Sequence, residues 1–415
     1  MGAILDLAER GWQGLEKNLW RTTGASEEIA PGLFFVHTFA NVSVARTTAG
    51  LVLVDTGSWF GRDATFETVR RCDPGPLFAA VYTHGHVDHA FGLPPFLAEA
   101  KSKGWPRPRI VGHENVSSRF DRYQSTAGYN AAINARQFGT RISWPTEYDY
   151  PDTTYEESLR LEAGDTVFEL HHARGETDDH TWTYWPDRKA LFTGDQFIWV
   201  TPNAGNPQKV QRYAADWAES LRAMLRCDAE LLVPGHGVPI FGRERVRQAL
   251  DETAHWLEHL VRETLDRMNT GMTLDAILQE VKPPADLADR PYLQPVYDDP
   301  EYVVRNIWRL YGGWYDGTPS HLKPSPEAQL GREVAALAGG VRALVARARD
   351  VAGGGDLRLA CHLLDWAVAA EPANRDAHAV RAEVYEARLH AERALMSKGV
   401  FGAAARDSRG KAEAK

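Results

Sequence analysis

The chain has 415 residues, of which 43% are hydrophobic and 25% are charged, and its formal net charge is −9. This length suffices for two or three globular domains, and the acidic balance disfavours a nucleic-acid partner, which would select a basic surface. No apolar run approaches the roughly 20 residues needed to cross a bilayer, so the sequence predicts no membrane partner.

The N-terminal segment, residues 1–25, is predicted to form an amphipathic helix. Asp6, Glu9 and Arg10 interrupt its apolar residues, so it lacks the continuous apolar core of a secretory signal peptide. The three cysteines of the chain are widely spaced and form no C-x-x-C pair, which is typical of buried thiols in a reducing compartment. Together these features predict a cytoplasmic protein.

The apolar run at residues 77–82 predicts the end of a buried strand. The turn that follows it contains three histidines and one aspartate in the pattern H-x-H-x-D-H. Side chains two positions apart share a face, so we expect His84 and His86 to point the same way. Asp88 and His89 are then free to turn toward a second point nearby.

Imidazole and carboxylate groups are the ligands that a borderline divalent metal such as zinc prefers. Two pairs of such ligands side by side predict two neighbouring metal ions, an arrangement that generates hydroxide at neutral pH. The first stretch cannot complete the coordination of both ions alone. The remaining ligands must come from distant segments that end at the same sheet edge.

Three later segments supply these candidates. Residues 191–193 form an apolar run that leads into Asp195, and residues 231–233 form another that leads into His236. Glu176 precedes both, in a turn rich in polar residues. Each candidate therefore follows a predicted strand or turn.

The H-x-H-x-D-H run and the order of these motifs resemble the metallo-β-lactamase superfamily of hydrolases. The resemblance implies an α/β fold, an αββα sandwich with the metal site at one edge. The turn Asp55-Thr56-Gly57, after apolar residues 52–54, matches an early strand of that superfamily. The resemblance implies that Asp55 supports the site by orienting a ligand imidazole.

The resemblance implies seven metal ligands: His84, His86, Asp88, His89, Glu176, Asp195 and His236. The first two histidines and Glu176 would hold one ion, and Asp88, His89 and His236 would hold the other. Asp195 stands at the usual place of a carboxylate that bridges both ions. We therefore expect two divalent ions per chain, with zinc as the favoured metal.

Two residues near these ligands are candidate catalytic groups. Asp88 lies within the first motif, and His180 follows Glu176 closely enough to serve as a general acid beside the metals. A supporting role for His180 is the alternative.

Glu176 stands where most superfamily members carry a histidine, and this exchange resembles the alkylsulfatase branch, which cleaves sulfate monoesters of alkyl chains. Residues 311–319 also resemble a segment of the alkylsulfatase dimerisation domain. The resemblance covers most of residues 30–395. It implies a homodimer that is joined through the C-terminal helical region.

The chain departs from that branch in its substrate-binding segments. Residues 203–212 replace an Arg-Gly-Ala run whose arginine helps to hold sulfate, so Lys209 and Arg212 are the candidate replacements. Asn130 and Arg136 are further candidates in a long insertion, because a guanidinium binds two oxygens of a tetrahedral anion at once. The C-terminal sterol-carrier-like domain of the long alkylsulfatases has no counterpart, which favours a smaller or more soluble ester.

Beyond residue 243 the sequence changes from short apolar runs between turns to helical periodicity. We therefore predict a metal hydrolase domain at 26–243, an all-α dimerisation domain at 244–401 and a disordered tail at 402–415. Residues 357–395 predict a helix-turn-helix that resembles one tetratricopeptide unit, which must bury its second face elsewhere.

These features predict a binuclear metallohydrolase that cleaves sulfate monoesters with a metal-bound hydroxide. A carboxylic or thioester hydrolase, or a phosphodiesterase, on the same metal pair is the enzymatic alternative. The missing Arg-Gly-Ala run favours it, because an acyl substrate needs no basic cradle. A non-catalytic assembly module is the third alternative, and the seven filled ligand positions argue against it. The expected partners are a small-molecule ester and a second copy of the chain.

Overall fold

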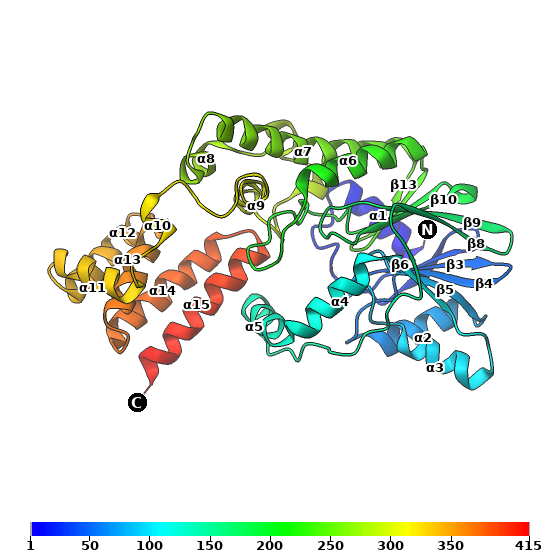
Figure 1. The fold of residues 1–415 in the computed structure, drawn as a ribbon, viewed down its shortest axis with the longest axis horizontal. Coiled ribbons are helices and arrows are strands. Elements are labelled where there is room, and N and C mark those ends of the chain that lie inside the picture. Colours follow the sequence, from blue (N-terminus) through cyan, green and yellow to red (C-terminus); the bar gives the residue numbers. More distant parts are fainter. Residues whose placement is uncertain (1, 415) are drawn as a thin grey trace.

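The computed structural model describes residues 2–414, in which two β-sheets are stacked between helices and followed by a second group of helices (Figure 1). The first sheet contains seven strands in sequence order: β1 (Ser26–Ala30), β2 (Leu33–Val36), β3 (Val42–Thr47), β4 (Gly50–Val54), β5 (Leu77–Val81), β6 (Arg109–His113) and β7 (Thr153–Tyr155). Strands β1 to β4 are antiparallel, and β4 to β7 are parallel. The parallel part places the carboxyl ends of β4 and β5 side by side.

The second sheet has the strand order β13-β12-β11-β10-β9-β8. Its strands are β8 (Ser158–Ala163), β9 (Thr166–His172), β10 (Thr181–Trp185), β11 (Ala190–Gly194), β12 (Leu231–Pro234) and β13 (Ile240–Phe241). Strands β11 and β12 are parallel neighbours, so the residues that follow them, Asp195 and the turn to His236, leave the sheet at the same edge.

Apolar side chains from the two sheets form one shared core. Val54 and Val81 from the first sheet pack with Phe168, Phe192 and Val233 from the second, and the exposed fraction of each is below 5%. This burial removes the apolar faces of both sheets from water, which is the main favourable term for stacking them.

Helices cover both outer faces of the sandwich. The first sheet is covered by α2 (Arg62–Cys72), α3 (Pro94–Lys103) and α4 (Asn115–Ser125), and the second by α6 (Ala214–Met224) and α7 (Arg243–Asn269). α1 (Ala3–Trp12) lies beside the sandwich and buries Ile4 in its core. The predicted αββα sandwich is therefore confirmed.

The C-terminal half is helical, as predicted, and α5 (Ala127–Phe138) lies close to it (Figure 1). Its helices are α8 (Leu274–Glu280), α9 (Pro300–Gly312), α10 (Pro319–Leu322), α11 (Glu327–Leu337), α12 (Val341–Gly353), α13 (Leu357–Ala370), α14 (Arg375–Ala391) and α15 (Leu395–Glu413). α13 and α14 are the two helices of the predicted helix-turn-helix. None of the helices in residues 2–414 combines the length and apolar character that crossing a membrane requires.

The hydrophobic cores divide at a different place from the sequence pattern. Leu257 of α7, Ile277 of α8 and Ile307 of α9 share one core with Leu232 of the second sheet. A separate core begins only with α11 and extends to α15. The change at residue 243 therefore marks where helical sequence begins, and the sandwich core continues through α9.

The predicted disordered tail is wrong, because α15 continues through residues 402–413. Gly402, Ala405 and Ser408 are buried, and Ser408 accepts a 2.7 Å hydrogen bond from Arg381 on α14. These residues recur every third position and give the helix a narrow face of small side chains. The segment is polar on average, so its composition does not reveal this face, against which α14 packs.

Candidate metal centre

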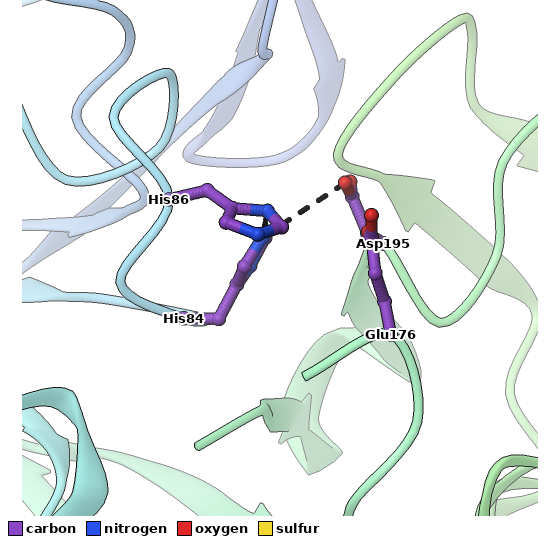
Figure 2. Close-up of side chains that lie close together, drawn as sticks. All are labelled: His84, His86, Glu176 and Asp195. Atoms are coloured by element: carbon purple, nitrogen blue, oxygen red, sulfur yellow. Dashed lines mark hydrogen bonds and ion pairs between the residues drawn. The ribbon is translucent and has the colours of Figure 1, made fainter. Parts of the chain in front are cut away.

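The first group of ligand candidates lies between the two sheets' carboxyl-terminal edges. His84 and His86 follow β5, and Figure 2 shows them facing Glu176 and Asp195 from the opposite side of the site. One ligand atom from each of these four residues lies within 4.8 Å of the others. Figure 2 also marks an ion pair across this gap, and Nε2 of His84 lies 3.9 Å from Oδ2 of Asp195.

The second group contains Asp88, His89 and His236, whose ligand atoms also lie within 4.8 Å of one another. The Nε2 atoms of the two histidines are 3.3 Å apart. Nδ1 of His89 donates to Asp55 and Nδ1 of His236 donates to the carbonyl of Phe39, so both Nε2 atoms present lone pairs. Two lone pairs that face each other in this way fit a shared cation.

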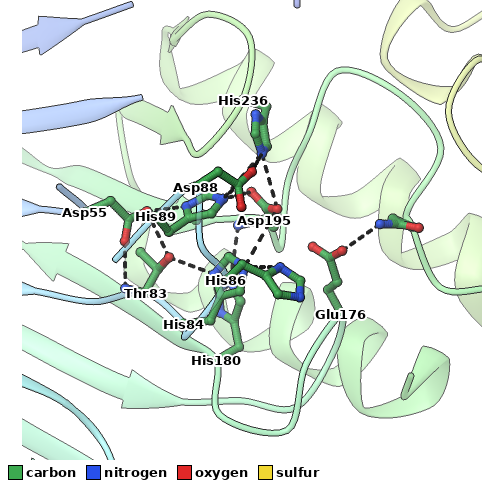
Figure 3. Close-up of polar contacts among 12 residues, drawn as sticks. Asp55, Thr83, His84, His86, Asp88, His89, Glu176, His180, Asp195 and His236 are labelled. Carbon is green, nitrogen blue, oxygen red and sulfur yellow. Dashed lines mark hydrogen bonds and ion pairs between the residues drawn. The ribbon is translucent and has the colours of Figure 1, made fainter. Parts of the chain in front are cut away.

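Asp195 lies between the two groups. Its Oδ1 is 3.4 Å from Nε2 of His89, and its Oδ2 is 3.5 Å from Nε2 of His236 and 3.9 Å from Nε2 of His84. Figure 3 shows the carboxylate at the centre of these contacts. Asp195 therefore lies within contact range of candidate ligands from both groups.

The unpaired atoms of the site test whether cations would fit it. Among residues 2–414, Oε2 of Glu176 and Oδ1 of Asp195 are buried and accept no hydrogen bond. A buried carboxylate oxygen without a partner is costly unless a positive charge satisfies it. Burial lowers the pKa of His89, but the carboxylates of Asp195, Asp55 and Asp88 outweigh burial and raise it well above its ordinary value. The site therefore favours positive charge, and its mixed imidazole and carboxylate donors suit divalent metals.

Asp55 holds two of the candidate ligands in place through its carboxylate (Figure 3). Oδ2 accepts a 2.7 Å hydrogen bond from Nδ1 of His89, and the Thr83 backbone and hydroxyl donate to Oδ1 and Oδ2 at 2.8 and 2.9 Å. The Thr83 hydroxyl also lies 3.0 Å from Nδ1 of His84. Asp55 adopts a φ of 59°, an uncommon conformation for a residue with a side chain, and such conformations concentrate at functional sites.

Asn41 positions the turn that presents His236. Its side-chain amide donates 3.0 Å hydrogen bonds to the carbonyls of Pro234 and Gly237, and its backbone N–H donates to Gly235. A Cβ atom at Gly235 would lie 2.5 Å from Oδ1 of Asp195, so this turn requires a glycine. The sequence analysis missed Asn41, because nothing in its local pattern connects it with a turn almost 200 residues away.

Two buried residues of the segment 203–212 hold Glu176. The amide of Asn203 donates a 2.6 Å hydrogen bond to Oε1 of Glu176, and Nη1 of Arg212 contacts the same oxygen. Burial raises the pKa of Glu176 to about 7, and Arg212 opposes that effect. Arg212 therefore keeps this carboxylate available as a ligand near neutral pH. Asn203 was also missed from the sequence.

A cavity of about 480 Å³ opens over the two ligand groups. Aromatic side chains form much of its wall: Trp20, Phe39, Trp59, Phe60, Tyr123, Phe138, Trp144 and Tyr297. Trp20 stacks on His236, with ring centroids 4.6 Å apart. Lys209 and Arg212 line the same cavity. The candidate metal centre, the positively charged side chains of Lys209 and Arg212 and an apolar wall therefore line the same cavity.

Two family models match this chain in sequence. The model of the metallo-beta-lactamase superfamily matches residues 37–236, and the model of alkyl sulfatase dimerisation matches residues 273–411. The chain therefore combines a metallo-β-lactamase superfamily domain with an alkylsulfatase dimerisation domain. The second match extends to residue 411, so that domain includes most of α15.

Known alkylsulfatases resemble this metallo-β-lactamase protein over most of its length. A linear primary-alkylsulfatase from a Pseudomonas strain is 28% identical over 81% of this chain and 68% of its own length. An (R)-specific secondary-alkylsulfatase from Pseudomonas sp. is 29% identical over 86% of this chain and 58% of its own length. The chain thus spans about three fifths to two thirds of these curated relatives.

Among solved structures, the stereoselective inverting sec-alkylsulfatase Pisa1 from Pseudomonas sp. has a TM-score of 0.83 to this protein. Its sequence identity is 23%, and the match covers 94% of this chain and 66% of that one. This likeness shows that nearly the whole fold of this chain, including the order of the metal domain and the helical domain, is present in that protein.

His180 lies behind the metal groups and does not line the cavity of this metallo-β-lactamase domain. Its Nε2 accepts a 3.1 Å hydrogen bond from the backbone N–H of Asp195, and its ring stacks on His84 at 5.0 Å. Burial lowers the pKa of His180 to about 3. A neutral imidazole whose Nε2 already accepts a hydrogen bond has no proton to donate there, so the structure contradicts the predicted general acid and supports a positioning role.

Asn130 and Arg136 do not line the cavity either, which corrects their prediction as substrate-binding residues. The Asn130 amide donates to the backbone and hydroxyl of Thr126, one turn earlier in α5. Arg136 donates a 2.9 Å hydrogen bond to Gln208 in an exposed position. The helical period decides this outcome, because α5 turns other residues toward the cavity.

Exchanging Asp55 for asparagine is expected to weaken metal binding by about 10- to 100-fold, because supporting partners of ligand histidines typically contribute that much. The variant keeps the size of the side chain but removes the charge that orients His89. Titration with a competing chelator measures the affinity, and Asp63→Asn, an exposed aspartate on α2, is the control. Equal affinities for Asp55→Asn and the parent protein would show that the contact is dispensable.

Proposed function

We propose that this protein is a metal-dependent hydrolase that cleaves sulfate monoesters of apolar alcohols. The observation that carries the proposal is a single cavity in which metal ligands, Lys209 and Arg212 meet an aromatic wall. A sulfate monoester has the matching parts, an anionic head and an apolar tail. The names of the related alkylsulfatases support the same substrate class.

In this proposal the seven ligands hold two divalent cations, with His84, His86 and Glu176 around one and Asp88, His89 and His236 around the other. Zinc is the favoured ion, because imidazoles and carboxylates together suit it. When bound, such cations supply Lewis acidity and lower the pKa of water from about 16 toward about 7. Asp195 lies within reach of both groups and keeps them together.

In this proposal the side chains of Lys209 and Arg212 bind and orient the anionic sulfate group of the ester. Burial lowers the pKa of Lys209 to about 8, so its ammonium group remains mostly charged at pH 7. Nε of Arg212 is buried and donates to no acceptor among residues 2–414. That N–H is therefore unpaired within the part of the chain that the structure describes, while Nη1 of the same side chain holds Glu176.

The proposed assembly is a homodimer joined through the dimerisation domain, and the proposed location is cytoplasmic. In that domain, Tyr311 lies in the last turn of α9 and Trp314 follows this helix. Both aromatic side chains are exposed, and a second copy of the chain would cover them. The three cysteines carry free thiols, which fits a reducing compartment. Sedimentation at several protein concentrations tests the dimer.

The test of function is a panel of sulfate, phosphate, carboxylic and thio esters with purified, metal-loaded protein. Turnover confined to sulfate esters supports the proposal. Preferred turnover of carboxylic or thioesters supports the alternative of an acyl ester hydrolase. One observation favours this alternative: Arg212 contacts Glu176, which leaves fewer positively charged groups for a sulfate. Clearly less than one bound metal per chain, with no turnover, supports a non-catalytic module.

Within a series of linear alkyl sulfates, each added methylene is expected to raise kcat/KM about threefold to fourfold until the chain outgrows the cavity. Burial of one methylene contributes about 0.8 kcal/mol, which corresponds to that factor. Initial rates across the series measure the effect. In the variant Phe60→Ala, which removes part of the aromatic wall, each added methylene should raise kcat/KM by a smaller factor. A flat profile in the parent protein would contradict an apolar tail site.

A further inference from the structure

The first turns of α15 touch the wall of the substrate cavity. A Cβ atom built on Gly399 would lie 2.2 Å from the carbonyl oxygen of Gln137 and 2.8 Å from its Cα. The backbones of α15 and α5 are therefore in direct contact, and any side chain at this position would push them apart. This contact joins the last helix of the dimerisation domain to a helix of the metallo-β-lactamase domain.

α5 depends on this contact for its position. It lies away from both sheets and beside α15 (Figure 1), and α15 is its most extensive packing partner. The helix ends at Gly139, which has a φ of 70°, and a Cβ atom there would lie 3.5 Å from the guanidinium of Arg406 on α15. A cation at this end also suits the negative end of the α5 dipole.

Several side chains of α5 also face the cavity. Asn134, Gln137 and Phe138 line it, and residues 140–144 continue the same wall up to Trp144. Oε1 of Gln137 is buried and accepts no hydrogen bond among residues 2–414. A displacement of α15 would therefore move α5 and the side chains of α5 that a substrate would touch.

The start of α15 also contacts the other wall. The side-chain amide of Asn206, which lines the cavity, lies 3.3 Å from Sδ of Met396. The backbone N–H of Met396 donates to the carbonyl of Tyr297, another lining residue, at 3.1 Å. One turn of α15 thus touches three separate segments around the cavity.

We propose that α15 is a structural part of the substrate site, in which Gly399 and Arg406 act as positioning residues for the α5 wall. Because α15 holds α5, the dimerisation domain determines how much room the cavity leaves for the tail of the ester. The identity of that tail rests on the proposed sulfate-ester function, whereas the contact between α15 and α5 does not.

The test compares Gly399→Ala with Gly410→Ala. Both changes replace a helical glycine of α15 and improve intrinsic helix propensity equally, but a Cβ atom at Gly410 meets nothing within 4 Å. Hydrogen exchange of residues 127–144 is expected to accelerate about tenfold in Gly399→Ala and to stay unchanged in Gly410→Ala. KM for the longest accepted alkyl sulfate should rise about tenfold, while kcat for the shortest stays within twofold.

Arg406→Ala provides a second comparison if Gly399→Ala folds poorly, because Arg406 is exposed and its loss leaves the α15 core intact. Arg409→Ala, which removes an exposed pair with Glu386 on α14, is its control. Faster exchange of residues 127–144 in Arg406→Ala alone supports the proposal. Unchanged exchange in both α5-facing variants would overturn it, as would faster exchange with an unchanged chain-length profile.

The two proposals fail separately. If the parent protein hydrolyses no sulfate ester, the proposed function is lost, but hydrogen exchange still decides whether α15 holds α5. The chain-length comparison is then repeated with the ester class that the parent does hydrolyse.

Discussion

Replacement of Asp195 by alanine is expected to reduce kcat/KM by about a thousandfold or more and to lower the metal content of the purified protein. The oxygens of the Asp195 carboxylate reach ligand candidates of both groups, His84 in the first and His89 and His236 in the second. Its loss leaves each group short of a negative ligand. It also removes the buried charge that favours a cation at this point.

Asp187→Ala is the matched control, because this exposed aspartate precedes the same strand, β11, and lies outside the cavity. Metal content by elemental analysis and initial rates should remain at parent values in the control. Parent levels of both metal and turnover in Asp195→Ala would exclude the seven-residue centre. A variant that keeps its metals but loses turnover would assign Asp195 to the reaction alone.

Replacement of Arg212 by methionine is expected to lower metal affinity at pH 7 by about tenfold for each unit by which the pKa of Glu176 rises, because the metal must then displace a proton from that carboxyl. Methionine retains the volume of the side chain but leaves Glu176 with only the Asn203 amide as a hydrogen-bond donor.

The pKa of Glu176 determines how metal affinity depends on pH. Burial already raises the pKa of Glu176 to about 7, and Arg212 works against that rise. Without Arg212 the pKa increases further, so protons compete with the metal over a higher pH range. Metal affinity in the parent should fall as pH drops through about 7, and the same fall in Arg212→Met should occur at higher pH.

Chelator competition between about pH 6 and about pH 9, from roughly one unit below to two units above the pKa of Glu176, measures both curves. Arg160→Met serves as the control, because Arg160 pairs with Glu169 on the exposed surface of the second sheet. The double variant Arg212→Met, Glu176→Gln should lose the shifted pH dependence, since glutamine carries no titrating group. Coincident curves for the parent and Arg212→Met would show that Arg212 does not control Glu176.

Motifs in the sequence, through their resemblance to the metallo-β-lactamase superfamily, were enough to predict the sandwich and the seven ligand candidates. The reason is that His84, His86, Asp88 and His89 lie in one turn, and Asp195 and His236 follow apolar strands whose ends meet at a common sheet edge. The bounds of α13, Leu357–Ala370, also follow from local periodicity and from the Pro-x-Asn turn after it. Each of these features is encoded within a few neighbouring residues.

The supporting residues and the cavity wall could not be predicted in this way. Asn203 and Asn41 act on Glu176 and on the His236 turn only because distant loops fold back onto the site. His180 lies near Glu176 in sequence, yet its backbone setting turns the ring behind the ligands. Asn130 and Arg136 have suitable chemistry, but helical geometry turns both away from the cavity.

The sequence by itself determined the fold class, the candidate ligands and the relation to alkylsulfatases, because strand ends and histidine spacing are local properties. The tertiary structure alone decided that the sandwich core extends through α9, that residues 402–413 form a helix with one narrow buried face, and that α15 touches α5 at Gly399. Such contacts depend on which surfaces meet after the chain has collapsed. Small residues with little hydrophobic signal become decisive there, because only they allow two backbones to touch.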